Sequence, residues 1–272
     1  SQFTDESIFS IPPYKVEAVM LAASRQVDWG LEMTGIPALW RITKGKGVKV
    51  AVLDTGISGH PSFVGSVLAE QGFYGPYGAA DGNGHGSASA SIVGGRDTGG
   101  SVIGVAPECS LLIGKVLGDN GSGGAPSVSA GIRWAADQGA DVINMSFGSP
   151  QPEPRIQDAV DYAVGKGCIL VAAAGNEGPL IDSVGYPARW PNVISVGAID
   201  SQKRIANFSS RGDRVDVVAA GVHVLVCWPP RQYAQLDGTS FSAPFVSGVI
   251  ALILAAHRAV EGTQSLSMSA VL

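Results

Sequence analysis

Four polar residues of this 272-residue chain have the side chains that acyl transfer requires: a hydroxyl, an imidazole, a carboxylate and an amide. In such chemistry a serine attacks a carbonyl carbon, and a histidine takes and later returns its proton. A carboxylate orients the imidazole, and an amide N–H donates to the oxyanion. The candidates are Ser240, His85, Asp54 and Asn176.

Ser240 stands in the sequence Asp-Gly-Thr-Ser-Phe-Ser-Ala-Pro, directly before an apolar segment at 245–256 that predicts a buried helix. At the N-terminus of a helix, free N–H groups and the positive end of the helix dipole favour negative charge, which suits an oxyanion. A Thr-Ser pair before a helix is, however, commonly only a helix cap. Whether Ser240 is a nucleophile or a helix cap therefore depends on the positions of the other three candidates.

The other three candidates also stand at the ends of predicted elements. Asp54 follows an apolar run in Asp-Thr-Gly, and Asn176 follows another in Ala-Ala-Ala-Gly-Asn-Glu-Gly. His85, between glycines, starts a stretch of small residues. Each alone is usually a structural turn residue, but all four share a position where strands end or helices begin.

Apolar runs and amphipathic stretches alternate along the chain, which predicts an α/β fold: a mostly parallel central β-sheet with helices on both faces. Side chains at the carboxyl ends of such strands gather at one edge of the sheet, so we expect the four candidates to meet there. The predicted strands are 48–53, 111–116, 141–146, 168–173 and 193–196, and the predicted helices are 85–93, 126–138, 154–164 and 245–256.

Composition excludes several classes of protein. The chain is 45% hydrophobic and 15% charged, with a net charge of -5 and no basic block, which argues against a nucleic-acid partner. On the sequence, we expect its apolar runs to be too short or too interrupted to span a bilayer, and so expect no membrane partner. The three cysteines, Cys109, Cys168 and Cys227, are widely spaced. They predict neither a disulfide framework nor a zinc site, and they fit a reducing compartment.

Three motifs together are specific: Ala-Val-Leu-Asp-Thr-Gly-Ile at 51–57, Asn-Gly-His-Gly at 83–86 and Gly-Thr-Ser-Phe-Ser-Ala-Pro at 238–244. With the order Asp, His, Asn, Ser, the chain resembles the subtilisin-like serine proteases, or subtilases, from about residue 25 to the helix after Ser240. The resemblance implies the three-layer α/β fold and a serine endopeptidase of broad specificity. By position, Ser240 is then the nucleophile, His85 the general base and acid, Asp54 the orienting carboxylate and Asn176 an oxyanion donor.

The resemblance also implies how a substrate is bound. Two segments of small residues, 121–123 and 146–148, would sandwich an extended substrate strand. A roomy pocket, walled by residues 173–175, 147–148 and 185 with Glu177 at its rim, would take the side chain before the scissile bond. The implied substrate-binding residues are Gly121, Ser122, Gly123, Ser146, Phe147, Gly148, Ala173, Ala174, Gly175, Glu177 and Gly185. Protein or peptide substrates are the expected partners, and a homodimer is compatible with the resemblance.

Residues 1–24 are predicted to be an extension before a catalytic domain at 25–272. Its motif Ile11-Pro12-Pro13-Tyr14 is similar to one in intracellular subtilisins, where the extension lies across the active site. The prolines exclude a helix there and hinder a cleavable geometry, while Lys15–Ser24 is expected to form a short helix. This similarity implies autoinhibition and a cytoplasmic location; a disordered tail and an extracellular protein are the alternatives.

Some positions depart from the subtilase pattern. Ser87-Ala88 stand where the family usually has Thr-His, so the packing around His85 is expected to differ. The strong calcium site is not expected, because the sequence offers Ser62 and an unusual loop at 96–101 in place of the acidic ligands. No cofactor is required for the chemistry. A weaker calcium or sodium site, and a cis peptide bond at Tyr186-Pro187, are implied by resemblance; the site would use Ala188, Trp190, Val193 and Asp216.

Two other functions stay open on the sequence. The altered segment after His85 is compatible with a subtilase-fold binding module that no longer cuts, although all four candidate residues are present. The chain is also compatible with a secreted subtilase lacking its pro-domain. The segment Ser265 to Leu272 starts what resembles another helix and then stops, so we expect the final elements of the domain to be missing.

Overall fold

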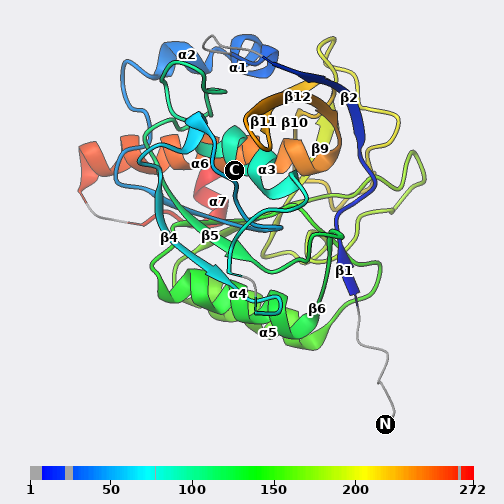
Figure 1. Cartoon of the computed structure of the whole chain (residues 1–272). Helices are drawn as coiled ribbons and strands as arrows, with labels where there is room; N and C mark the ends of the chain where they lie inside the picture. Colours follow the sequence, from blue (N-terminus) through cyan, green and yellow to red (C-terminus); the bar gives the residue numbers. More distant parts are fainter. Residues whose placement is uncertain (1–7, 22–26, 77, 263–264) are drawn as a thin grey trace.

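The computed structural model describes residues 8–21, 27–76, 78–262 and 265–272. In this part of the chain the centre of the molecule is a seven-stranded sheet in the order β10-β9-β8-β7-β3-β5-β4, with every pair parallel (Figure 1). The strands are β3 (Lys49–Asp54), β4 (Val67–Gly72), β5 (Ser110–Lys115), β7 (Val142–Met145), β8 (Ile169–Ala173), β9 (Ile194–Ile199) and β10 (Val217–Ala220).

Helices cover both faces of this sheet, which confirms the predicted three-layer α/β fold. Helices α4 (Ala125–Asp137) and α5 (Pro154–Gly165) lie on one face, and α3 (His85–Gly94) and α6 (Thr239–Glu261) on the other (Figure 1). Strand β3 is apolar along most of its length because it packs into a hydrophobic core on each face of the sheet. Val50 and Val52 belong to the core under α3 and α6, whereas Ala51 and Leu53 belong to the core under α4 and α5. A strand buried on both faces needs no polar alternation.

Helix α6 begins earlier than the sequence predicted and continues through Pro244. A proline inside a helix removes the N–H that would bond to the carbonyl four residues earlier, here that of Ser240. The hydroxyl of Ser146 donates to this carbonyl instead, at 2.8 Å. Helix α6 has 23 residues, and its most apolar 18-residue stretch has a mean hydropathy of 1.8, so by length and composition it could cross a membrane, contrary to our expectation for the apolar runs. In the protein, 72% of that stretch is buried, as in a core helix.

Two small sheets involve the N-terminal segment. Strand β1 (Ile8–Ser10) pairs with β6 (Ser122–Gly124), and β2 (Lys15–Met20) joins β12 (Gln232–Asp237) and β11 (Val224–Trp228). The predicted helix at 15–24 is therefore wrong over 15–20, because the free edge of β12 offers hydrogen bonds that a lone short helix lacks. Residues 22–26, which include the predicted domain boundary, lie outside the described residues. The short helices are α1 (Trp29–Thr34), α2 (Ile36–Leu39), the 3₁₀ helix η1 (Pro61–Phe63) and α7 (Met268–Val271).

Candidate active site

The four candidate residues are carried by element ends on one edge of the central sheet. Asp54 is the last residue of β3, and Asn176 follows β8. His85 is the first residue of α3, and Ser240 is the second residue of α6. One hydrogen bond connects the end of β3 to the start of α3, and another connects the turn after β8 to the start of α6.

Asp54 and His85 are in direct contact. The Nδ1 atom of His85 lies 2.8 Å from Oδ1 of Asp54, and both side chains are buried. The same carboxylate oxygen accepts a bond of 2.7 Å from the N–H of Thr55. Among the residues that the structure describes, none is hydrogen-bonded to Nε2 of His85. One ring nitrogen is therefore fixed by the carboxylate, and the other is left for proton transfer.

Asp81 holds the N-terminus of the helix that carries His85. Its carboxylate accepts bonds from the N–H groups of Asn83, Gly84 and Ser87, at 3.0, 2.8 and 2.9 Å. The hydroxyl of Ser87 adds a bond of 2.6 Å. Burial by itself would raise the pKa of Asp81, but these bonds hold the pKa below its ordinary value. Asp81, four residues before His85, is a functional candidate that the sequence analysis did not single out.

Ser240 is not hydrogen-bonded to His85 in this structure. Its hydroxyl donates to the carbonyl oxygen of Ser146 at 3.3 Å. It is also not a helix cap: the N-cap of α6 is Gly238, without a side-chain bond, and Ser240 lies inside the first turn. Ser240 is buried, and residues of the N-terminal segment contact its neighbours Phe241 and Asn176.

Asn176 is held in place by the residue before Ser240 and donates to the N-terminal segment. Its Oδ1 atom accepts from the N–H of Thr239 at 3.0 Å and from the hydroxyl of Thr239 at 2.7 Å. Because Oδ1 is occupied in this way, the NH₂ group is directed to the other side, where it donates to the carbonyl oxygen of Pro13 at 2.7 Å. Asn176 thus presents an amide donor to a backbone carbonyl beside Ser240.

Residues 8–11 lie between the two segments predicted to sandwich a substrate. Strand β1 is antiparallel to β6, with Phe9 opposite Gly123. Ser10 exchanges two backbone hydrogen bonds with Gly148, of 3.0 and 2.9 Å. Ile11 donates to the carbonyl of Gly121 at 3.0 Å, and a Cβ on Gly121 would lie 2.8 Å from its side chain. The chain therefore binds its own N-terminal segment as a strand.

Aromatic side chains complete this contact. The ring of Tyr14 lies 5.3 Å from the ring of His85 and 5.7 Å from that of Phe241. Burial, followed by the nearby charges of Asp54 and Asp81, raises the pKa of Tyr14. The ring of Phe9 is fully buried 6.1 Å from that of Phe147. Sequence analysis missed Phe9, although its alternation with Ile11 is a weak strand signal.

A cavity of about 580 Å³ opens beside Pro12 and Pro13. Phe147 does not line it, contrary to the expectation, because its ring is buried against Phe9. Ser146 is also directed elsewhere, since its hydroxyl donates to Ser240. The predicted substrate residues in its wall are Gly148, Ala173, Ala174, Gly175, Glu177 and Gly185.

The predicted weak cation site offers one carboxylate. The Oδ2 atom of Asp216 accepts from the N–H of Ser195 at 2.8 Å, and the carbonyl of Trp190 accepts from the N–H of Val193 at 3.1 Å. A single anionic ligand with backbone carbonyls suits sodium better than calcium, which prefers several carboxylates. This cation site stays a prediction. The neighbouring Tyr186-Pro187 peptide bond is cis, as predicted.

Comparison with known proteins agrees with this arrangement. A model of the subtilase family matches residues 45–272. The chain is 42% identical over 232 residues to subtilisin Savinase of Lederbergia lenta, covering 85% of each protein. It is 40% identical over 235 residues to the major intracellular serine protease of Bacillus subtilis (strain 168), covering 82% of this chain and 74% of that protein.

A third relative, M-protease of Shouchella clausii (strain KSM-K16), is 41% identical over 239 residues, and the match spans 62% of its length. The family match extends over most of the chain and includes the strand and helix ends that carry Asp54, His85 and Ser240. On this similarity and on its three-layer fold, the chain belongs to the subtilase family.

Proposed function

We propose that this chain is a serine endopeptidase that hydrolyses peptide bonds of protein or peptide substrates with broad specificity. The observation that carries the proposal is the 2.7 Å bond from Asn176 to the carbonyl of Pro13, because it is the contact an oxyanion donor makes with a bound peptide. The Asp54–His85 contact and relatives named as serine proteases support it.

In the proposed mechanism, the hydroxyl of Ser240 turns from Ser146 to Nε2 of His85. The oxygen then attacks the scissile carbonyl carbon while His85 takes the proton. Asp54 keeps the imidazole oriented and stabilises its positive charge. The side-chain amide of Asn176 and the backbone N–H of Ser240 bind the oxyanion. The C–N bond breaks as His85 protonates the leaving amine, and water hydrolyses the acyl-enzyme by the same steps.

The N-terminal extension is proposed to inhibit this reaction. Its residues Ile11, Pro12, Pro13 and Tyr14 follow the strand that fills the substrate sandwich, and the ring of Tyr14 lies over His85. Proline fixes φ and has no N–H, so the segment binds without reaching a geometry that can be cleaved. Displacement or removal of the extension would then expose Ser240.

A cytoplasmic location is proposed from two observations. Cys109, Cys168 and Cys227 are all free and buried, as is usual in a reducing compartment. Two of the similar proteins are named as intracellular serine proteases. Fractionation of the source cells, followed by detection with an antibody, tests this point.

A binding module that does not cut is the second candidate, favoured by the absence of a Ser240–His85 hydrogen bond in the described structure. A phosphonylating reagent specific for activated serine decides between the two. We expect it to label Ser240 after removal of the extension and to leave the covered site largely unlabelled. Ser240→Ala should lose both labelling and casein hydrolysis, whereas the matched control Ser242→Ala should retain both. Casein hydrolysis by Ser240→Ala would contradict the proposal.

A further inference from the structure

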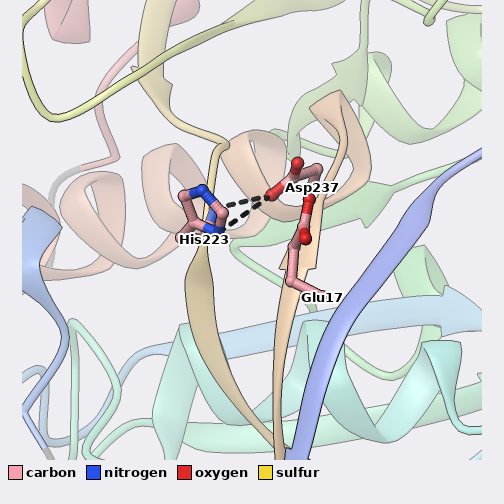
Figure 2. Close-up of side chains that lie close together, drawn as sticks. All are labelled: Glu17, His223 and Asp237. Carbon is pink, nitrogen blue, oxygen red and sulfur yellow. Dashed lines mark hydrogen bonds and ion pairs between the residues drawn. The ribbon is translucent and has the colours of Figure 1, made fainter.

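Glu17, His223 and Asp237 bring three metal-ligating side chains together outside the active site (Figure 2). One ligand atom from each residue lies within 4.8 Å of the other two. Glu17 belongs to β2 of the N-terminal extension, whereas Asp237 ends β12 and His223 lies in the turn between β10 and β11. The cluster therefore joins the extension to the strand that leads into Ser240.

A β-bulge places Glu17 in this cluster. Ala18 pairs with Gln235 and Val16 pairs with Leu236, so β2 has one more residue than β12 at this point, and that residue is Glu17. A bulge leaves the extra residue unpaired and redirects its side chain. The backbone irregularity thus brings the carboxylate of Glu17 to that of Asp237.

The two carboxylates form a pair that favours a cation. An oxygen of each carboxyl group lies within 4.8 Å of an oxygen of the other, so a cation between them can bind both. Lys15 neutralises one side only: its ammonium group lies 2.6 Å from Oε1 of Glu17 and is 69% exposed.

His223 supplies a nitrogen ligand on the other side of Asp237. Its backbone N–H donates to Oδ1 of Asp237 at 2.7 Å, and its ring Nδ1 lies 4.0 Å from the same oxygen (Figure 2). The residue has a φ of 51°, a left-handed conformation, which fixes where its side chain starts. Two carboxylates and an imidazole are ligands that zinc accepts, at about 2.0–2.2 Å. Ligand atoms of one such ion lie about 3–3.5 Å apart, so small side-chain rotations suffice.

We propose that Glu17, His223 and Asp237 form a binding site for a divalent transition-metal ion of the zinc class, which fastens the N-terminal extension to β12. The docked extension completes a three-ligand site, whereas its release leaves two ligands. Because the ion binds the docked state more tightly, it stabilises that state. The regulatory consequence rests on the proposed inhibition by the extension, but metal binding does not.

Zinc binding to the full-length Ser240→Ala protein tests the site without any need for catalysis. After treatment with a chelator and its removal, titration calorimetry with zinc chloride should show one ion per chain. Glu17→Gln and His223→Asn should each weaken binding at least about tenfold. Asparagine is chosen at 223 because it tolerates a positive φ. The matched control is Glu70→Gln, which makes the same change on β4 and should bind zinc as the parent does.

Hydrogen exchange of the amides in 15–20 provides the second measurement. Zinc should slow this exchange at least about tenfold in the parent and leave it unchanged in Glu17→Gln. The proposal is overturned if zinc does not bind, if both variants bind it like the parent, or if bound zinc does not slow exchange. A peptidase assay that fails while these results hold would reject the proposed function and leave the metal site standing.

Discussion

The side-chain amide of Asn176 donates to the carbonyl oxygen of Pro13 across 2.7 Å. Asn176 thus binds a carbonyl of the same chain, one residue before Tyr14, whose ring contacts that of His85. This contact defines which peptide bond of the extension is nearest to the proposed oxyanion site, and it leads to the first prediction.

Pro13→Ala should make the chain cut itself between residues 13 and 14. Alanine restores the backbone N–H and frees φ, so the segment can adopt the geometry of a substrate. Intact mass after incubation should show the loss of residues 1–13. The double variant Pro13→Ala with Ser240→Ala is the control and should stay whole. Cleavage at another bond would contradict the assignment of the Pro13 carbonyl.

Phe9→Ala should raise the activity of the full-length chain. Truncation of a buried phenylalanine costs about 3–5 kcal/mol in a protein core, and here that loss falls on docking of the extension against Phe147. Initial rates on a peptide substrate should rise by at least about tenfold. Ile8→Ala is the matched control, because Ile8 is 64% exposed; an equal rise in both variants would argue against a specific role of Phe9.

Inhibition by the extension should weaken under alkaline conditions. The pKa of Tyr14 is raised in the docked state by burial and by Asp54 and Asp81. Its contribution to docking is therefore complete below the ordinary tyrosine pKa of about 10 and is lost as the pH rises through the higher docked value. The ratio of full-length to extension-free activity should rise above about pH 10. In Tyr14→Phe that component of the rise should disappear; an unchanged pH dependence would contradict this role.

Asn176→Ala should lower kcat of the extension-free protein with little change in the binding of substrate. Removal of the oxyanion asparagine from subtilisin itself lowers kcat by roughly 10²–10³, and we carry that family value over. Steady-state kinetics measures the effect. Asn192→Ala, which removes an amide bonded only to the exposed Asp161 among the described contacts, is the control and should leave kcat unchanged. A loss confined to KM would contradict the assigned role.

The cysteines should be inert in the folded protein. Burial, together with the charge of Asp141, raises the pKa of Cys168 to about 11, and burial raises that of Cys109 to about 12. At pH 8 the thiolate fraction of Cys168 is then on the order of one in a thousand. Iodoacetamide should modify the cysteines only after unfolding, and rapid labelling of the native protein would contradict their burial.

The sequence predicted the central sheet because its strands are continuous apolar runs bounded by turn residues, as in β3 and β8. It also placed Asp54, His85, Asn176 and Ser240 at element ends, and the structure puts these ends on one edge of the sheet. These features are predictable because a strand buried on both faces needs consecutive apolar residues, and a tight turn needs glycine at a nearby position. Both requirements concern residues that are close together in the sequence.

Only the tertiary structure decided how the extension is bound. Residues 15–20 were expected to be helical, yet they form a strand because β12 leaves an edge open. The burial of Phe9 against Phe147 and the meeting of Glu17 with His223 and Asp237 join segments far apart in sequence. Which edge receives a distant strand, and in what register, depends on the folded surface, so spacing along the chain does not encode it.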